Sequence, residues 1–202
     1  MRVYNGSRWV CTYQLPSEPI ADGAFIASGG GLGQEVGTGV ALDASGNVYV
    51  VGKYEGTATF GATSISSVGN EDIFIAKYNA MGTLQWLQSA GGTSDDRGHS
   101  VEVDSAGNVY VTGYYEGTAT FGATSKTSAG SRDIFIAKYS TGGTLQWLQS
   151  AGGSSGDEGN SVAIDASGNV YSTGFYQGTV TFGASSKTSA GFYDVFLARI
   201  SQ

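Results

Sequence analysis

Asp104-Ser105-Ala106-Gly107-Asn108-Val109-Tyr110-Val111 is the stretch that decides the fold, because the chain contains it three times. Residues 43–50 read DASGNVYV, and residues 165–172 read DASGNVYS. The step from position 43 to position 104 equals the step from 104 to 165, and this step is the period of the repeat. Constant spacing without insertions indicates equal structural units that stack beside one another, so the function must be sought as the property of an array.

The first half of the middle unit predicts a β-hairpin. Residues 100–104 alternate apolar and polar side chains and lead into residues 105–108, where a glycine suits a tight turn. The second strand covers residues 109–115, which are rich in tyrosine and β-branched residues. Gly113 interrupts that strand, so we expect a bulge or a close neighbouring backbone there.

The second half of the unit predicts two further strands. Residues 117–122 are bounded by glycines, and we expect a loop excursion whose Phe121 returns to the core, as do Phe60 and Phe182 at equivalent places. Residues 133–139 form an almost continuous apolar run, which suits a strand covered on both faces, and residues 144–150 supply a fourth strand. Four short antiparallel strands that need a neighbour on each face are typical of a β-propeller blade. The alternative, a linear β-solenoid, usually has shorter coils.

Three motifs in fixed order carry a family resemblance. They are Gly107-Asn108-Val109-Tyr110-Val111-Thr112-Gly113, then Asp133-Ile134-Phe135-Ile136-Ala137-Lys138-Tyr139, then Gly143-Thr144-Leu145-Gln146-Trp147. The chain resembles the SBBP family of bacterial β-propeller repeats over residues 23–202. The resemblance implies an all-β propeller of four-stranded antiparallel blades, and it implies no single activity, because the family is a scaffold.

Composition narrows the functional classes. The 202 residues include 33 glycines and 2 prolines, with 12% aromatic and 13% charged residues, which describes short strands joined by tight turns. The net charge of −7 disfavours nucleic acid as a partner. The sequence contains no apolar run of about 18 residues, the length that could span a bilayer. The amino terminus also lacks a secretory signal, so we expect no membrane partner.

The residues that usually carry chemistry are scarce. Cys11 is the single cysteine and His99 the single histidine, so the sequence predicts no intrachain disulfide, no metal site, no cofactor and no catalytic residues. We interpret His99 as a surface turn residue. An intermolecular bridge through Cys11 is an alternative.

The two ends of the repeat are out of step. The last unit stops at its third strand, residues 194–200, while Phe25 lies one period before Trp86 of a fourth strand. We therefore expect a segment at the amino-terminal end to complete the last blade. This assembly prediction involves two groups of residues: Ala24, Phe25, Ile26 and Ala27, and Val195, Phe196, Leu197 and Ala198.

Three blades are too few for a ring, since propellers typically need about four to eight. The hypothesis is a homodimer of six blades whose copies exchange amino-terminal strands. A nine-bladed trimer is the alternative. A fragment of a longer propeller is another, although the start at Met1 and the strand offset favour a whole assembly unit.

Residues 1–22 do not follow the period and are interpreted as a separate segment before the propeller unit of residues 23–202. Residues 2–10 predict a hairpin around Asn5-Gly6, with Tyr4 and Trp9 as cross-strand aromatics. This opening resembles the start of bacteriophage tail and capsid accessory proteins, which implies attachment to a larger particle through Tyr4 and Trp9. The alternative is that these aromatics cap the floor of the ring.

A ligand on a symmetric scaffold should meet repeated residues. The candidates follow the second strand of each unit: Tyr54, Glu55, Tyr115, Glu116, Tyr176 and Gln177. Aromatic planes beside a carboxylate or amide suit a sugar ring. The alternative is that the tyrosines wedge between blades, and the same ambiguity applies to Trp86 and Trp147.

The acidic residues are interpreted as turn residues or ion-pair partners rather than as catalytic or metal-binding groups. Asp95-Asp96, Asp157-Glu158 and Glu35 are interpreted as solvated turns, with calcium binding as the alternative. The aspartates at positions 43, 104 and 165 are expected to form turns. The basic residues at 77, 138 and 199 are expected to pair with the aspartates at 72, 133 and 194.

The sequence favours a non-enzymatic structural or display protein, most specifically a virion accessory protein that is tail-associated or decorates a capsid. Its expected partners are further copies of itself and virion proteins. The alternative is a lectin-like adhesin that binds cell-surface glycans at a bacterial surface or after secretion. An enzyme ranks third, because no titratable groups converge on a place where the repeat symmetry breaks.

Overall fold

The computed structural model describes residues 2–4, 9–11 and 25–200. Every regular element in this described part is a β-strand, and all the ladders between these strands are antiparallel. The expected all-β class is therefore confirmed. No helix long and apolar enough to cross a membrane occurs among the described residues.

The first two units each form a four-stranded ladder in chain order. We call residues 35–92 the first unit, residues 97–151 the second and residues 158–200 the third. The first unit contains β4 (Glu35–Leu42), β5 (Val48–Phe60), β6 (Thr63–Tyr78) and β7 (Leu84–Gly92). The second contains β8 (Arg97–Val103), β9 (Val109–Phe121), β10 (Thr124–Tyr139) and β11 (Leu145–Ala151).

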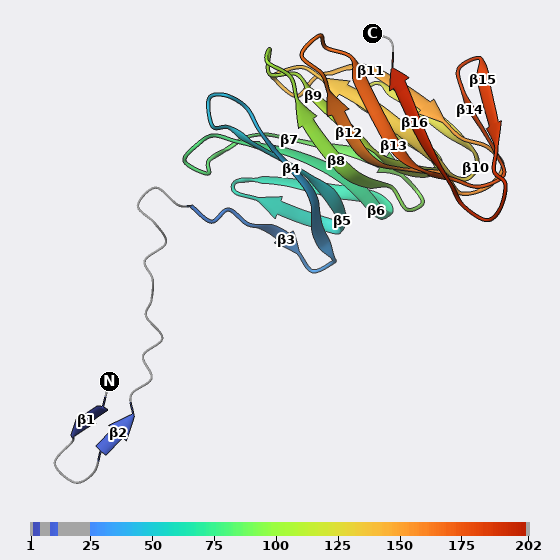
Figure 1. The fold of residues 1–202 in the computed structure, drawn as a ribbon. Helices are drawn as coiled ribbons and strands as arrows, with labels where there is room; N and C mark the ends of the chain where they lie inside the picture. Colours follow the sequence, from blue (N-terminus) through green and yellow to red (C-terminus); the bar gives the residue numbers. More distant parts are fainter. Residues whose placement is uncertain (1, 5–8, 12–24, 201–202) are drawn as a thin grey trace.

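Among the described residues, the third unit has no strand equivalent to β7 or β11, the fourth strands of the other two units. It contains β12 (Glu158–Ile164), β13 (Val170–Tyr176), a hairpin of β14 (Thr179–Phe182) and β15 (Ser185–Thr188), and β16 (Asp194–Ile200). The sheet order is β12-β13-β16, so β16 lies at an edge, with β13 as its partner. Figure 1 shows β16 ending beside the carboxyl terminus, on the opposite side of the fan of sheets from β3.

The glycine-bounded excursion is a hairpin, which corrects the predicted loop. In the second unit, the ends of β9 and β10 pair from Phe121↔Thr124 to Thr118↔Thr127. The expected return of the phenylalanine is confirmed, since Phe121 is fully buried and its ring centroid lies 4.9 Å from that of Phe135. The hairpin also links the units, because the end of β7 pairs with the end of β9.

Gly113 confirms the expected close backbone. An added Cβ would lie 1.9 Å from the carbonyl oxygen of Arg97, and the β8–β9 register shifts between Gly98 and Ser100. Gly52 and Gly174 repeat this contact at 1.9 Å in the other two units. A side chain is thus excluded where the first two strands of each unit cross most closely.

The predicted aspartate turns are confirmed in all three units. The Asp104 carboxylate accepts hydrogen bonds from the backbone N–H of Ala106 at 2.9 Å and of Asn108 at 2.8 Å. Its other oxygen accepts from Asn108 Nδ2 at 2.8 Å and from the Tyr110 hydroxyl at 3.1 Å. Gly107 follows with a φ of 81°, a conformation that glycine adopts without strain. The repeated DxxGNxY pattern is therefore a turn clamp.

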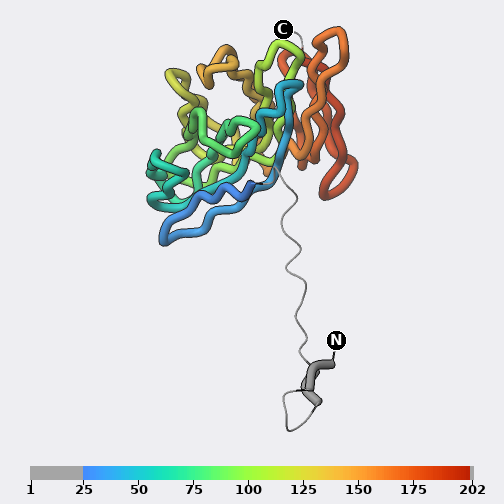
Figure 2. The backbone as a smooth tube through the Cα atoms, turned by 90° about the vertical axis from the view of Figure 1, so that its left-hand side faces the viewer, coloured from blue at the N-terminus to red at the C-terminus, as the bar shows by residue number. Residues whose placement is uncertain are grey.

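Apolar side chains fuse neighbouring units into continuous cores. One buried cluster joins Ile73 and Ile75 of the first unit to Val101 of the second. Another joins Ile134 and Ile136 of the second unit to residues of the third, including Val162. Figure 2 shows the third unit, coloured orange to red, along one side of the other two units. The predicted face-to-face stacking of units is confirmed.

The amino-terminal pieces differ in how far they follow the prediction. β1 (Arg2–Tyr4) and β2 (Trp9–Cys11) pair antiparallel with Tyr4 opposite Trp9, as the hairpin prediction requires. The turn at residues 5–8, and residue Ala24, lie outside the described residues. The attachment role of Tyr4 and Trp9 stays a prediction.

The expected amino-terminal strand does not form within the chain. The strand of this region is β3 (Gly29–Gly31), which pairs with the end of β5 rather than with β16. Residues 25–28 form no ladder, and Ile26 is 82% exposed. The physical reason is distance, because the edge that this segment was expected to join belongs to the far end of the array.

Candidate interaction surface

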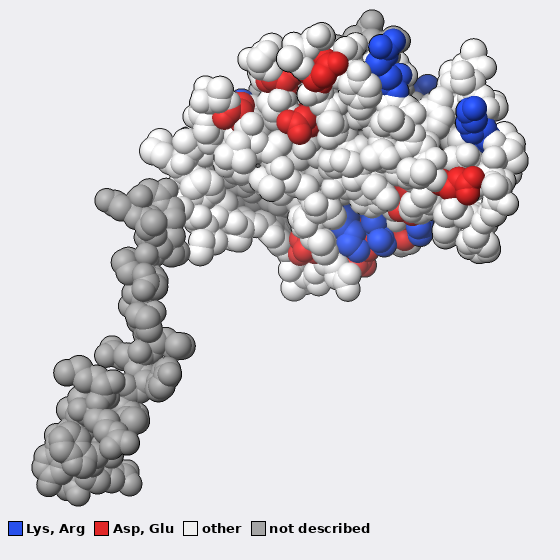
Figure 3. Space-filling view, viewed as in Figure 1, with Lys and Arg blue, Asp and Glu red and all other residues white. Residues whose placement is uncertain are grey.

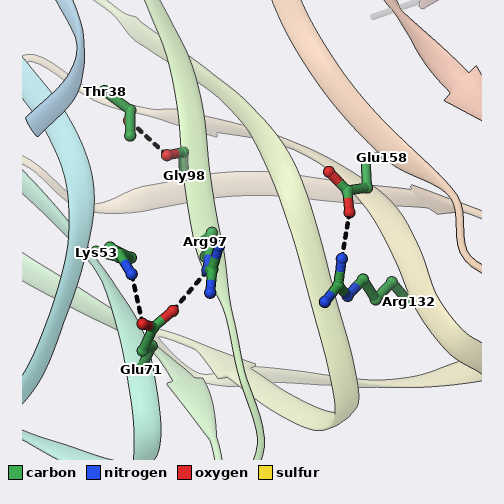
Figure 4. Close-up of polar contacts among 7 residues, drawn as sticks. All are labelled: Thr38, Lys53, Glu71, Arg97, Gly98, Arg132 and Glu158. Carbon is green, nitrogen blue, oxygen red and sulfur yellow. Dashed lines mark hydrogen bonds and ion pairs between the residues drawn. The ribbon is translucent and has the colours of Figure 1, made fainter. Parts of the chain in front are cut away.

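Ion pairs cross both contacts between units, and their polarity reverses from one contact to the next. At the first contact, Glu71 accepts from Lys53 of its own unit and from Arg97 Nε of the second unit, the latter at 2.5 Å. At the second contact, Arg132 Nη1 donates to Glu158 Oε1 of the third unit at 2.6 Å. Figure 4 shows both pairs bridging neighbouring strands.

These pairs occupy equivalent positions. Arg132 lies one period after Glu71, and Glu158 lies one period after Arg97, so acid and base have exchanged places. Burial opposes the ionisation of Glu71, but the hydrogen bonds from Lys53 and Arg97 outweigh it and hold its pKa below the ordinary value. The sequence reasoning missed these pairs, although comparing the three units position by position would have revealed the reversal.

The reversed pairs give each contact its own polarity, and this can be tested. We expect Glu71→Arg to lower the free energy of unfolding by about 1–2 kcal/mol, because three cations would then meet at a partly exposed site. Adding Arg97→Glu should recover at least half of that loss, since an anion would again face the new cation. Urea unfolding of the four proteins of the cycle measures both effects, and strictly additive losses would contradict the pairing.

A second, buried set of aspartates fastens the units, which corrects the prediction of solvated turns. Asp96 is fully buried, and its carboxylate accepts from the backbone N–H of Gly92 at 2.7 Å and of Glu116 at 3.1 Å. Asp157 repeats this arrangement with Gly153 and Gln177. These carboxylates join the end of one unit to the second strand of the next.

Burial also changes how these aspartates titrate. It raises the pKa of Asp96 to about 7 in spite of the two backbone hydrogen bonds. It raises the pKa of Asp72, 1% exposed, to about 6, and one oxygen of that carboxylate has no hydrogen-bond partner. Among the described residues, no group of three or more His, Cys, Asp or Glu side chains could hold a metal ion.

The predicted sugar-binding tyrosines do not face solvent. Tyr54, Tyr115 and Tyr176 are 0%, 1% and 6% exposed, so their ring faces cannot stack on a ligand. Their neighbours differ: Glu55 is exposed, while Glu116 and Gln177 are half-buried. The alternative that the tyrosines wedge into the core is what the structure shows, because the second strand of each unit lies between two others.

Two smaller expectations are corrected. His99 is not a surface turn residue: it lies on β8, half-buried, with Nδ1 3.1 Å from the carbonyl oxygen of Gly159 in the third unit. Lys77 and Lys138 lie over the rings of Tyr49 and Tyr110 rather than against the predicted aspartates.

Trp86 and Trp147 pack against tyrosines, which agrees with the interpretation of these residues as packing rather than ligand-binding groups. Trp86 meets Tyr49 edge-on with ring centroids 6.1 Å apart, and its indole N–H donates to the carbonyl oxygen of Thr141 in the second unit. Trp147 meets Tyr110 in the same way at 6.0 Å. Neither ring stands free on the surface as a recognition platform.

The predicted assembly residues lie at an open edge. Val195 and Leu197 of β16 are 78% and 77% exposed, while Phe196 is buried. A groove of about 550 Å³ runs along β16 and is lined mainly by β16, the β14–β15 hairpin and the end of β11. The other predicted group is also exposed where it is described, with Phe25 at 39% and Ile26 at 82%.

One face of the molecule carries few charges. Most of the face drawn in Figure 3 is uncharged, with acidic and basic residues confined to small areas. Each unit is built of antiparallel strands, and the units dock face to face through apolar side chains, glycines and ion pairs. This arrangement defines a repeat β-sheet protein of the propeller class.

A family model matches the chain at two places. Residues 85–114 and 146–174 match the SBBP family model, a beta-propeller repeat, so the chain contains SBBP repeats. The two matches begin one period apart, in step with the repeated turn sequence. The predicted resemblance is thereby confirmed, whereas the resemblance of residues 2–10 to bacteriophage proteins stays a prediction.

Two curated proteins are similar to the chain. The uncharacterized WD repeat-containing protein L264 of Acanthamoeba polyphaga mimivirus is 31% identical over 198 residues, which cover 82% of this chain and 14% of that protein. The regulatory protein FlaEY of Caulobacter vibrioides is 28% identical over 162 residues, which cover 77% of this chain and 17% of that protein. The chain thus spans less than a fifth of the length of either relative.

A solved structure of a protein of unknown function from Bacteroides caccae aligns with 69% of this chain and 53% of its own, at 15% identity and a TM-score of 0.31. The fold assignment rests instead on the ladders and on the repeat family.

Proposed function

We propose that the chain is a non-enzymatic β-propeller scaffold that assembles with further copies of itself and presents its surface to other proteins. The open edge at β16 carries the proposal. Its apolar residues and the adjoining groove of about 550 Å³ are a place for a fourth strand. The repeat supplies a strand of the right sequence in residues 24–27, which occupy the position of the fourth strand one period before β7.

The register of the missing strand follows from the second unit. There, Phe135 pairs with Ser150 and Ala137 with Leu148 across β10 and β11. Moving β10 forward by one period and β11 back by two periods places Phe196 opposite Ser28, and Ala198 opposite Ile26, of a second copy. Each copy would contribute three blades, and two copies would form a ring of six.

Self-association is tested by measuring mass in solution. We expect light scattering on the purified 202-residue chain to give twice the monomer mass of 20.7 kDa. Ile26→Pro should shift the protein to monomer, because proline cannot donate to a ladder. Leu32→Ala, at a fully exposed residue outside the ladders, is the control and should remain a dimer.

A folded monomer at all concentrations would refute the assembly, and a trimer would favour nine blades. A monomer would also fit a chain that is normally one part of a longer propeller.

The most specific form of the proposal is a virion accessory protein. It is supported by a viral relative with repeats, and it includes the prediction that Tyr4 and Trp9 attach the hairpin to a particle. Co-sedimentation of the chain with purified particles of its host system tests this setting, with a variant lacking residues 1–11 as the control. The glycan-binding alternative loses its repeated ring faces, because the three tyrosines are buried.

A further inference from the structure

The two ends of the array expose the same kinds of residues that bury themselves between units. On the outgoing side, Ile73 and Ile134 are fully buried against the following unit, while their counterpart Val195 is 78% exposed. On the incoming side, Val101 is 5% exposed and its counterpart Val40 is 63% exposed. We call the exposed side of the third unit the outgoing face and that of the first unit the incoming face.

A repeated glycine marks where the faces touch. An added Cβ on Gly98 would lie 2.3 Å from Val51 Cγ2 of the preceding unit, and one on Gly159 would lie 2.2 Å from Thr112 Oγ1. Gly37, their counterpart on the incoming face, would meet Val50 Cγ1 of its own unit at 3.6 Å and nothing closer. The sequence keeps glycine at the incoming face although the space there is open.

A polar contact repeats beside this glycine. Thr38 Oγ1 donates to the carbonyl oxygen of Gly98 at 2.6 Å, and His99 Nδ1 lies 3.1 Å from that of Gly159. The next donor in this series is Asn160, which is exposed on the third unit. The next acceptor in the series is the carbonyl oxygen of Gly37, at the opposite end of the array.

The ion-pair position changes character at the ends. On the outgoing face, the counterpart of Glu71 and Arg132 is Tyr193, which is 56% exposed. The residue equivalent to Arg97 and Glu158 on the incoming face is Val36, which is 43% exposed. An ion pair within the chain thus has an aromatic and an aliphatic side chain as its counterpart at the two ends. Neither would bring an unpaired charge into a contact.

We propose that the outgoing face of one copy docks on the incoming face of a second copy, in the geometry that joins the units within the chain. This inference rests on the assembly proposed above and identifies the residues that select the partner. Tyr193 meets Val36, Asn160 donates to the carbonyl oxygen of Gly37, and Gly37 lies against Thr173. The contact is head-to-tail and occurs twice in a closed pair of copies. Its apolar character distinguishes it from the two charged contacts, so the ends meet each other and not an internal face.

Two kinds of variant test the docking by sedimentation of the full chain over a range of concentrations. Gly37→Val should keep the fold, because the space at Gly37 is open, but raise the dissociation constant at least tenfold, equivalent to about 1.4 kcal/mol. Gly142→Val, at an exposed turn glycine, is the control and should leave the constant unchanged. Circular dichroism verifies that both variants are folded.

A charge pair supplies the second test. Tyr193→Glu alone should weaken association at least tenfold, because it would bury an unpaired carboxylate against Val36. Combining Tyr193→Glu with Val36→Arg should restore association to within about threefold of the original, since it recreates the polarity of Glu71 and Arg97 across the two copies.

The outcomes separate this inference from the proposed function. If Ile26→Pro dissociates the protein while Gly37→Val and Tyr193→Glu do not, strand exchange stands and the docking of the faces is refuted. If the unaltered chain is a monomer throughout, both fall. Rescue by the double variant supports the docking, and its failure to exceed either single variant overturns the pairing of Tyr193 with Val36.

Discussion

Replacing Gly113 by alanine is expected to lower the free energy of unfolding by about 3 kcal/mol or more, a loss at the upper end for a single methyl group. The new Cβ would lie 1.9 Å from the carbonyl oxygen of Arg97 and 2.9 Å from Phe135 Cε1. A backbone oxygen in a ladder cannot rotate away as a side chain can. The first two strands of the second unit must therefore separate, which breaks their hydrogen bonds and opens the core.

The measurement is urea unfolding of Gly113→Ala followed by tryptophan fluorescence and circular dichroism. Gly142→Ala is the matched control, because that glycine is exposed and its nearest neighbour to an added Cβ is Ser140 Oγ at 3.9 Å. The control should change stability by less than about 0.5 kcal/mol. Equal stabilities for the two variants would show that the close approach of β8 and β9 is not a constraint.

Raising the pH from 5 to 8 is expected to destabilise the protein by about 2 kcal/mol or more. Burial raises the pKa of Asp72 to about 6 and of Asp96 to about 7, compared with 3.8 for an ordinary aspartate. Between pH 4 and pH 7 the folded state therefore binds more protons than the unfolded state. Stability is greatest below that range for these groups and is lost as the pH rises through their folded pKa values.

Other carboxylates set the acid limit. Burial opposes ionisation of Asp104, but its hydrogen bonds from Asn108 and Tyr110 outweigh it and hold the pKa below the ordinary value. The balance is similar at Glu71, where Lys53 and Arg97 lower the pKa. These two groups contribute stability that is lost as the pH falls below about 4. The two effects together place the stability maximum at mildly acidic pH.

Urea unfolding at pH 5, 6.5 and 8 measures the slope of the free energy of unfolding against pH. Asp96→Asn should reduce this slope by about half, because a neutral amide does not titrate and the pKa shift of Asp96 is therefore removed. The amide nitrogen cannot accept a hydrogen bond, so the variant also loses the bond from either Gly92 or Glu116. Glu55→Gln, at an exposed carboxylate of the first unit, is the control and should leave the slope unchanged. A stability that rises between pH 5 and pH 8 would contradict the prediction.

The reversed ion pairs explain how nearly identical units keep their order. Units of such similar sequence could dock on the wrong neighbour, because their apolar strands are almost interchangeable. Glu71 with Arg97 and Arg132 with Glu158 oppose this, since a wrong pairing brings like charges together. The ion pairs thus contribute more to the specificity of stacking than to its strength.

The sequence by itself determined the period, the strands and the turns. Asp104 with Asn108, and the glycine at 107, act within a few residues of each other, so the local pattern predicts their conformation directly. The apolar run at residues 133–139 likewise predicts a strand covered on both faces, and Ile134, Phe135 and Ile136 are all buried. Gly113 could be predicted as a close contact, because a glycine inside a strand has few other uses.

Only the tertiary structure decided what those strands place together. The burial of Tyr115 and Asp96, and the pairing of Arg97 with Glu71, depend on residues from different strands or neighbouring units. The exposure of Val195 depends on which unit is absent beside it. The physical reason is that the period fixes the shape of each unit, whereas burial and charge pairing arise from how the units stack.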